Sequence, residues 1–411
     1  MGGGDGDSED GSSDPSGPPI PFYVKAAVSG DETGDGSEAA PFATLGEAYD
    51  AALASGTRKR IVVLSDLMAD AEIVLDGQSA SDDEFVTIDG GGHKIERNTG
   101  SNESVLQIAG GAKIQFENIR VNGKNVQSSS GPVNNRAIKV TGSGTVVTLD
   151  AGTVVTGAFT GNLTLQGSGI SVDGGGKLVM NKGSEVTDCV GGSNCEGTVC
   201  VTGDGSVFEM NEGSRIHANK AYRGGGVAVY EKAAFTLKGG EISVNQAAGQ
   251  GGGVYGGSNA VISIENSGVI SENTAGAAGG GIFINGGTTL TMASGEIRGN
   301  HATTGGGAYL AGGTFTMKGG EIRGNNAGGA GGVYLGDGSD YLDITGGVIY
   351  GSEDAVPKAL RNNVIIFSSY AAAINRTNND ATVKIGDTVY TGDGNDETKK
   401  WNSTVDLRGN S

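Results

Sequence analysis

Two carboxylates recur at the spacing of an internal repeat in this chain. Glu296 and Glu321 occupy the same place in neighbouring repeat units. Adjacent carboxylates are what a divalent cation or an acid/base pair requires, so the two form a candidate acidic site. Arg298 and Arg323 follow them at the second position along. The alternative is therefore that opposite charges pair on a solvated sheet.

Four aromatic residues also recur at this spacing. Tyr255, Phe283, Tyr309 and Tyr334 each follow the glycine turn that opens a unit. Each lies between two positions that should point inward, so the four side chains are expected to point outward in one row, which Ala228 continues. Such a row could stack along a sugar chain or meet a partner protein. The alternative is that stacked rings stabilise their own sheet.

These positions belong to a repeat of roughly 26 to 28 residues between Gly224 and Ala330. Each unit has three short segments of alternating apolar and polar residues, separated by Gly and Asn clusters. Such a unit cannot bury its own apolar residues, so it must stack on its neighbours with strands about 4.8 Å apart. We therefore expect an all-β fold, a right-handed parallel β-helix of about ten or eleven coils with three strands per coil.

Alignment of the units gives two more columns. Apolar pairs such as Phe315 and Met317 alternate with polar residues, so they should point inward and form the core. A column of asparagines should form an amide ladder that satisfies backbone groups in the turns. Its members are Asn219, Asn245, Asn273, Asn300 and Asn325, with Cys189 and Ser352 in their place in the flanking coils.

The chain divides into four segments. Thr44 and Glu47 form a capping-box pattern ahead of an apolar stripe, which predicts a short helix covering the first coil. The last segment should cover the final coil against edge-to-edge association. The expected boundaries are a disordered tether at 1–21, an N-terminal cap at 22–60, the β-helix at 61–356 and a C-terminal cap at 357–411.

The formal charge of −19 argues against nucleic acid, itself a polyanion, as a partner. No run of about 18 apolar residues is present to span a membrane. Cys189, Cys195 and Cys200 lie close together in the sequence. They predict either a local disulfide or one buried thiol with two surface thiols. No histidine lies near them, so no metal site is expected there.

We predict no catalytic residue. No column shows two or three Asp residues on neighbouring coils with a basic residue opposite. The acidic tracts at 31–35, 337–340 and 393–397 lack the spacing of an EF-hand loop. Calcium is thus the one cofactor that the sequence leaves open.

The entry segment resembles a known family. The acidic turn SGDETGDGS, then PFATL, then the expected helix look like the start of pectate-lyase-like right-handed β-helix proteins. The resemblance implies the architecture. The enzymes of that family rely on clustered Asp residues with an Arg base or on an Asp trio, and many members have no catalytic role.

The repeats carry a second resemblance, over about Gly169 to Ser352. FTMKGGEIRGNNA with GGGV and GGGI resembles bacterial, spirochaete-type cell-surface β-helix proteins, and is distantly similar to the polymorphic outer-membrane protein adhesins. The start of the chain resembles the spacer of a bacterial surface lipoprotein. This implies an extracellular or cell-surface location, with membrane contact only through an N-terminal lipid anchor that this chain does not carry.

We therefore expect a non-enzymatic surface protein that acts in adhesion or binds an extracellular polymer, glycan or host protein. The row Tyr255, Phe283, Tyr309 and Tyr334 is its candidate binding site. The alternative is a carbohydrate-active enzyme, a polysaccharide lyase or glycoside hydrolase, with Glu296 and Glu321 as its acidic site.

Overall fold

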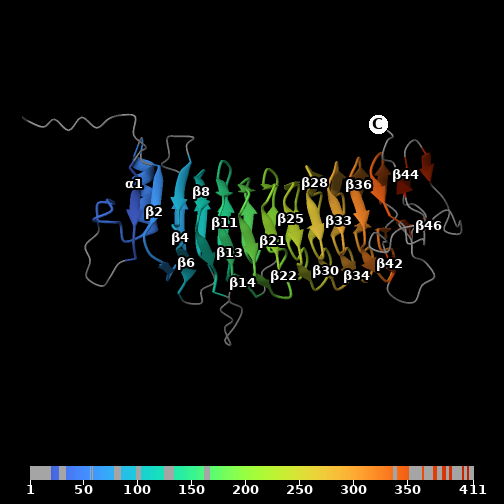
Figure 1. Ribbon diagram of the computed structural model, residues 1–411, viewed down its shortest axis with the longest axis horizontal. Coiled ribbons are helices and arrows are strands. Elements are labelled where there is room, and N and C mark those ends of the chain that lie inside the picture. The colour runs from blue at the N-terminus through green and yellow to red at the C-terminus, as the bar shows by residue number, and fades with distance from the viewer. Residues whose placement is uncertain are drawn as a thin grey trace, which may run out of the picture.

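The computed structural model describes residues 20–350, with gaps at 27–33, 56, 58, 78–84, 99–102, 125–133, 162–166 and 337–339, and the backbone of six short strands between 363 and 406. These residues form a rod in which strands follow one another along a single axis (Figure 1). The fold is an all-β parallel β-solenoid, and its smallest sheet gives about nine four-sided turns. The predicted parallel β-helix is confirmed. Its right hand stays a prediction.

Two of the long sheets, A and C, carry an uncharged stretch of outer face and the aromatic row, respectively. Sheet A has 14 described strands: β1 (Phe22–Val24), β2 (Arg60–Val63), β5 (Val86–Asp89), β8 (Lys113–Glu117), β12 (Val146–Leu149), β16 (Lys177–Met180), β20 (Val207–Asn211), β24 (Ala234–Lys238), β28 (Val261–Glu265), β32 (Thr289–Met292), β36 (Thr314–Met317), β40 (Tyr341–Ile344), β44 (Thr382–Ile385) and β45 (Thr388–Tyr390). Sheet C has 12: β4 (Ile73–Asp76), β7 (Leu106–Ala109), β11 (Ile138–Thr141), β15 (Ile170–Asp173), β19 (Val199–Thr202), β23 (Val227–Tyr230), β27 (Val254–Gly256), β31 (Ile282–Asn285), β35 (Ala308–Ala311), β39 (Val333–Leu335), β43 (Ile374–Arg376) and β46 (Lys400–Trp401).

The other two sheets close the coil. Sheet B has 12 described strands: β3 (Leu67–Ala69), β6 (Lys94–Arg97), β9 (Arg120–Asn122), β13 (Val154–Thr156), β17 (Glu185–Thr187), β21 (Arg215–His217), β25 (Glu241–Ser243), β29 (Val269–Ser271), β33 (Glu296–Arg298), β37 (Glu321–Arg323), β41 (Val348–Ile349) and β47 (Val405–Asp406). Sheet D has 9: β10 (Asn134–Asn135), β14 (Phe159–Thr160), β18 (Val190–Gly191), β22 (Lys220–Ala221), β26 (Gln246–Ala247), β30 (Thr274–Ala275), β34 (His301–Ala302), β38 (Asn326–Ala327) and β42 (Asn363–Val364).

Sheet D corrects the expectation of three strands per coil. From β14 to β38 its described strands are two residues long, as in Gln246–Ala247, and each pairs in parallel with the next, whereas β10 pairs antiparallel with β14. A strand of two residues is too short to show the alternation by which strands are recognised in a sequence. The coils of the repeat region therefore have four strands rather than three.

The N-terminal helix α1 (Leu45–Ala54) begins as predicted. Thr44 Oγ1 accepts the Glu47 N–H at 3.2 Å, and Glu47 Oε2 accepts the Thr44 N–H at 3.0 Å. Its apolar stripe is buried against the first strands of the rod, through Leu45, Ala48, Tyr49 and Ala52. In the part of the chain that the structure describes, no helix is long and apolar enough to cross a membrane.

The core is the inward column of sheet A with its counterparts in the other sheets. Phe208, Phe235, Ile262, Leu290 and Phe315 pair in register from coil to coil and are almost completely buried. Full burial of one such side chain contributes about 1.5–3 kcal/mol. The predicted core column is confirmed.

The predicted amide ladder is also present. Asn245 Nδ2 donates to the Ile216 carbonyl at 2.9 Å and to Asn273 Oδ1 at 3.0 Å, and the Asn245 N–H donates to the same oxygen. The pattern repeats for Asn219 and Asn300, and all five asparagines are fully buried. These buried amides are satisfied by one another and by the backbone.

The remaining expectations concern the boundary at 356 and segments outside the described residues. Parallel pairing continues past 356, because β43 pairs with β39 and β44 with β40. Residues 1–19 of the tether, Ser352, and the acidic tracts at 31–33, 337–339 and 393–397 lie outside the described residues. The disordered tether, the C-terminal cap and the lipid anchor therefore stay predictions.

Candidate functional site

The candidate aromatic row lies on the outer face of sheet C. Tyr255, Phe283, Tyr309 and Tyr334 are in-register neighbours on β27, β31, β35 and β39. Their ring centroids lie 5.3, 5.2 and 5.0 Å apart, with interplanar angles of 5°, 8° and 14°. The rings therefore stack face to face along the rod axis, as parallel in-register strands dictate.

The row points away from the main core but is only partly open to solvent. Tyr255 and Phe283 are 4% and 7% exposed, whereas Tyr309 and Tyr334 are half-buried. Tyr255 and Phe283 form a small second core with Ala278 of the turn before sheet C. Because each ring face covers the next, the row offers ring edges and hydroxyls rather than free faces. A sugar ring cannot stack between neighbouring members.

The N-terminal end of the row is closed by a charged cluster. Tyr230 stacks obliquely on Tyr255 at 5.4 Å, and its hydroxyl donates to Glu196. Arg223 lies 3.1 Å from Glu196 and its guanidinium carbon lies 5.5 Å from the centre of the Tyr255 ring. Burial, together with the negative charge of Glu196, raises the pKa of Tyr230 well above its usual range. This cluster could not be predicted from the sequence, because Glu196 and Arg223 lie outside the regular strands and meet only through an isolated bridge between neighbouring coils.

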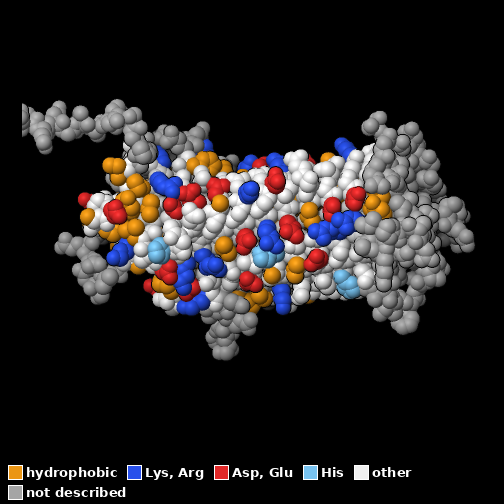
Figure 2. Space-filling model, viewed as in Figure 1, with side chains coloured by type: hydrophobic (Ala, Val, Ile, Leu, Met, Phe, Trp, Pro, Cys, Tyr) orange, Lys and Arg blue, Asp and Glu red, His pale blue; other side chains and the backbone are white. Residues whose placement is uncertain are grey.

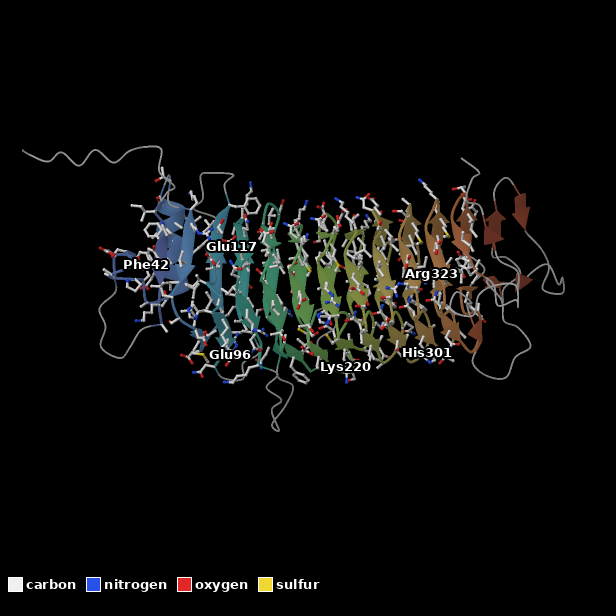
Figure 3. The ribbon with its side chains drawn as sticks, viewed as in Figure 1. Phe42, Glu96, Glu117, Lys220, His301 and Arg323 are labelled. Carbon is white, nitrogen blue, oxygen red and sulfur yellow. The ribbon has the colours of Figure 1, made fainter. Side chains whose placement is uncertain are left out.

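The candidate acidic site is neutralised by its neighbours. Glu296 and Glu321 pair in register on β33 and β37. Glu296 lies 3.0 Å from Arg298 and 2.7 Å from Arg323, and Arg323 also lies 3.3 Å from Glu321. Figure 2 shows red and blue side chains interspersed along this face of the rod, and Figure 3 places Arg323 in its C-terminal half. Both carboxylates already have cationic partners, so the ion-pair alternative is the arrangement found.

A second acidic group was missed from the sequence. Asp89 pairs in register with Glu117, and Asp150 takes the same position in the next coil, since Leu149 is in register with Phe116. We call this in-register column of Asp89, Glu117 and Asp150 a lane. Arg60 Nη2 lies 2.7 Å from Asp89 and also bonds Glu117. Three carboxylates on neighbouring coils with an arginine thus do occur, although the two Asp residues lie two coils apart with Glu117 between them. Unequal turn lengths before residue 168 hid the alignment.

The carboxylates of this lane already have hydrogen-bond partners within the protein. Burial disfavours the charged form of Arg60, but Glu117 and Asp89 outweigh that effect and raise its pKa. Asp150 accepts hydrogen bonds from Gln115 at 2.5 Å and from Asn181 at 2.6 Å. Among the described residues, no group of three or more His, Cys, Asp or Glu side chains is placed to hold a metal ion.

The three cysteines are all free and all buried. The alternative with two surface thiols is therefore wrong, and no disulfide joins them in this structure. Burial raises the pKa of Cys189 to about 12 and that of Cys195 to about 11, and raises that of Cys200 well above its usual value. Such thiols are poor nucleophiles.

One cavity lies apart from these groups, at the N-terminal end. It measures about 510 Å³ and lies between the start of α1 and the segment from Leu67 to Ile73. Hydrophobic side chains gather on the surface at this end in Figure 2. Met68, which lines the cavity, is 42% exposed.

Comparisons with protein-family models, with curated proteins and with solved structures find no match to this chain. The likeness to other proteins therefore rests on the parallel β-solenoid architecture alone.

Proposed function

We propose that this chain is a non-enzymatic recognition rod that binds an extracellular polymer or a cell-surface protein through its outer faces. The observation that carries the proposal is the aromatic row on sheet C, with Tyr309 and Tyr334 half-buried at its open end. Rings that stack on one another are held rigid, so little conformational entropy is lost when a partner docks on their edges. Display on a bacterial cell surface is part of the same proposal, on the resemblance of the repeats.

The state of the candidate acidic site agrees with a role in binding rather than catalysis. An acid/base pair needs carboxylates free to exchange protons with a substrate. Glu296 is held by two arginines and Glu321 by one, at 2.7–3.3 Å. In-register ion pairs of this kind suit a stable solvated face.

The test is a binding screen on arrays of glycans and matrix proteins. The purified chain should bind at least one ligand class. The double variant Tyr309→Ser, Tyr334→Ser should weaken protein-partner binding about tenfold or more, since aromatic residues dominate such contacts. Tyr350→Ser, a half-buried tyrosine outside the row, is the matched control. No binding by the wild-type chain to any glycan, matrix protein or cell surface would overturn the proposal.

A second candidate function is polysaccharide lyase or glycoside hydrolase activity. It is favoured by one observation, the lane Asp89, Glu117 and Asp150 with Arg60 beside it. The test is incubation with a panel of polyuronates and neutral glycans, with and without calcium. Unsaturated or shortened products that disappear in Glu117→Gln but persist in Glu265→Gln would establish an enzyme. Absence of products on every substrate would remove this candidate.

A further inference from the structure

The outer face of sheet A carries an uncharged array over four successive coils, β24, β28, β32 and β36. One outward column holds Thr236, Ser263, Thr291 and Thr316, paired in register. The other outward column, two residues earlier in each strand, holds Ala234, Val261, Thr289 and Thr314. We call these eight residues the hydroxyl face. All of them are half-buried or exposed.

The hydroxyl groups of this face are unoccupied by the protein itself. Within the described part of the chain, the hydroxyls of Thr289, Thr291 and Thr316 have no hydrogen-bond partner. Elsewhere on the rod, threonine hydroxyls commonly donate to backbone carbonyls, as Thr153 does to Phe116 and Thr198 to Gly225. The face therefore presents donors and acceptors that only solvent or a ligand can use.

Charge narrows the class of ligand. The chain has a formal charge of −19, and the outer face of sheet B carries in-register ion pairs such as that of Glu296 with Arg323. The eight positions of the hydroxyl face carry no charge. A polyanion would be repelled by the chain as a whole. Lys238 and Glu265 follow these columns at the ends of β24 and β28, so a charged partner would meet both signs at one edge of the face and none along it. The chemistry that fits is a neutral partner rich in hydroxyl groups.

The spacing of the face suits a linear partner. Neighbouring strands place equivalent hydroxyls about 4.8 Å apart along the rod, and the two columns lie about 6.7 Å apart across it. The rise per coil is close to the length that one hexopyranose residue adds to an extended polysaccharide chain. Methyl groups of Thr, Val and Ala between the hydroxyls suit the apolar faces of sugar rings.

We propose that the hydroxyl face binds a linear, neutral polysaccharide that lies along the rod, one sugar residue per coil. The proposal rests on the binding function proposed above and names its surface and ligand class. A second copy of this chain is the competing occupant. Four coils by two columns bury only a few hundred Å² per partner, below the roughly 800 Å² of a stable interface.

The experiment compares the wild-type chain with the double variant Thr291→Val, Thr316→Val. Valine keeps the shape and the strand propensity while it removes the two hydroxyls. Thr274→Val, on sheet D and also half-buried, is the matched control. The probes are soluble linear glucan, mannan, xylan and galactan, with polygalacturonate as the charged comparator, in isothermal titration. The expected result is binding to at least one neutral glycan, weakened about tenfold in the double variant and unchanged in Thr274→Val.

Other outcomes separate this inference from the proposed function. Neutral-glycan binding that survives the double variant, or binding confined to proteins or to polygalacturonate, overturns the inference and leaves the recognition rod standing. Self-association by sedimentation that the double variant abolishes also overturns it, because the face is then an interface between copies. A wild-type chain that binds nothing on any array overturns both.

Discussion

Positive backbone angles recur at the residue directly before each ladder asparagine. The φ values are 56° at Ala218, 57° at Val244 and 56° at Glu272, and glycine takes this place at Gly299 and Gly324. A β-branched residue is the least suited to this conformation, because its side chain crowds the backbone. Val244 is also 50% exposed, so its side chain contributes little burial in return.

Val244→Gly should therefore stabilise the protein. Relief of about 1–3 kcal/mol of backbone strain exceeds the extra chain entropy of glycine, about 0.5–1 kcal/mol. The expected gain in the free energy of unfolding is about 1 kcal/mol, measured from urea melts. The control Ser243→Gly changes an extended strand residue and should lower stability. A Val244→Gly variant no more stable than wild type would show that the strain is absent.

The buried thiols make stability depend on alkaline pH. Their pKa values are raised in the folded protein, to about 12 for Cys189 and about 11 for Cys195. The unfolded chain loses these protons near the ordinary cysteine pKa, so stability is fully present below that value and falls as pH rises above it. The slope is about 1.4 kcal/mol per thiol for each pH unit.

Urea melts between pH 7 and 10.5 measure this slope, and Cys195→Ala should reduce it by one thiol. Native Cys189 and Cys200 should resist alkylation at pH 8 and react after unfolding. Rapid alkylation of the native protein, or an alkaline slope that Cys195→Ala leaves unchanged, would show that these thiols are not buried.

At the scale of elements, the amide ladder depends on its central members. Asn273 donates to the Ile242 carbonyl and to Asn300, and its Oδ1 accepts two bonds from Asn245. Asn273→Ala leaves several buried polar groups unpaired, at about 1–3 kcal/mol each. We expect a loss of about 3–5 kcal/mol in the free energy of unfolding. Thr274→Ala, the half-buried neighbour, should cost less than about 0.5 kcal/mol. Equal losses in the two variants would show that the ladder contributes nothing.

The sequence predicted the elements whose signal is local and repeated. The inward pairs such as Phe315 and Met317, the asparagine column and the capping box of α1 all follow from period and residue type. For the candidate site, the sequence predicted only that the aromatic side chains point outward. Alternation placed Tyr255 on the outer face, but it carries no information on the turn residue Ala278, which belongs to the same buried cluster.

Features that depend on long-range register could not be predicted from the sequence. The lane of Asp89, Glu117 and Asp150 depends on the register of strands that are joined by loops of unequal length. Alternation within each strand does not say which residues of neighbouring coils pair. The contact of Glu196 with Tyr230 joins a residue between strands to the last residue of β23, 34 positions away. The strands of sheet D are too short to leave a periodic pattern.

In the whole molecule, each coil contacts its two neighbours, so the stability of one coil depends on the next. This stacking depends mainly on the inward residues and the backbone, so the surface chemistry of the four sheets can differ. Sheet B carries ion pairs, sheet C the aromatic row, and sheet A the hydroxyl face. Mutations on one face should therefore leave binding by another unchanged. This separation is what lets the tests of the aromatic row and of the hydroxyl face be read independently.

The rod must also protect its ends, and at the N-terminal end α1 packs against the first strands. Ala48 is fully buried between α1 and the first strands, while Asp50 is exposed on the opposite face of the helix. Ala48→Asp would bury an unpaired carboxylate at a cost of several kcal/mol, which should detach the helix. The uncovered strands would then offer a sheet edge to other molecules. We expect concentration-dependent oligomers in sedimentation velocity for Ala48→Asp that wild type does not form, and a profile unchanged from wild type for Asp50→Ala. An Ala48→Asp chain with wild-type sedimentation and stability would mean that the helix does not protect the end of the rod.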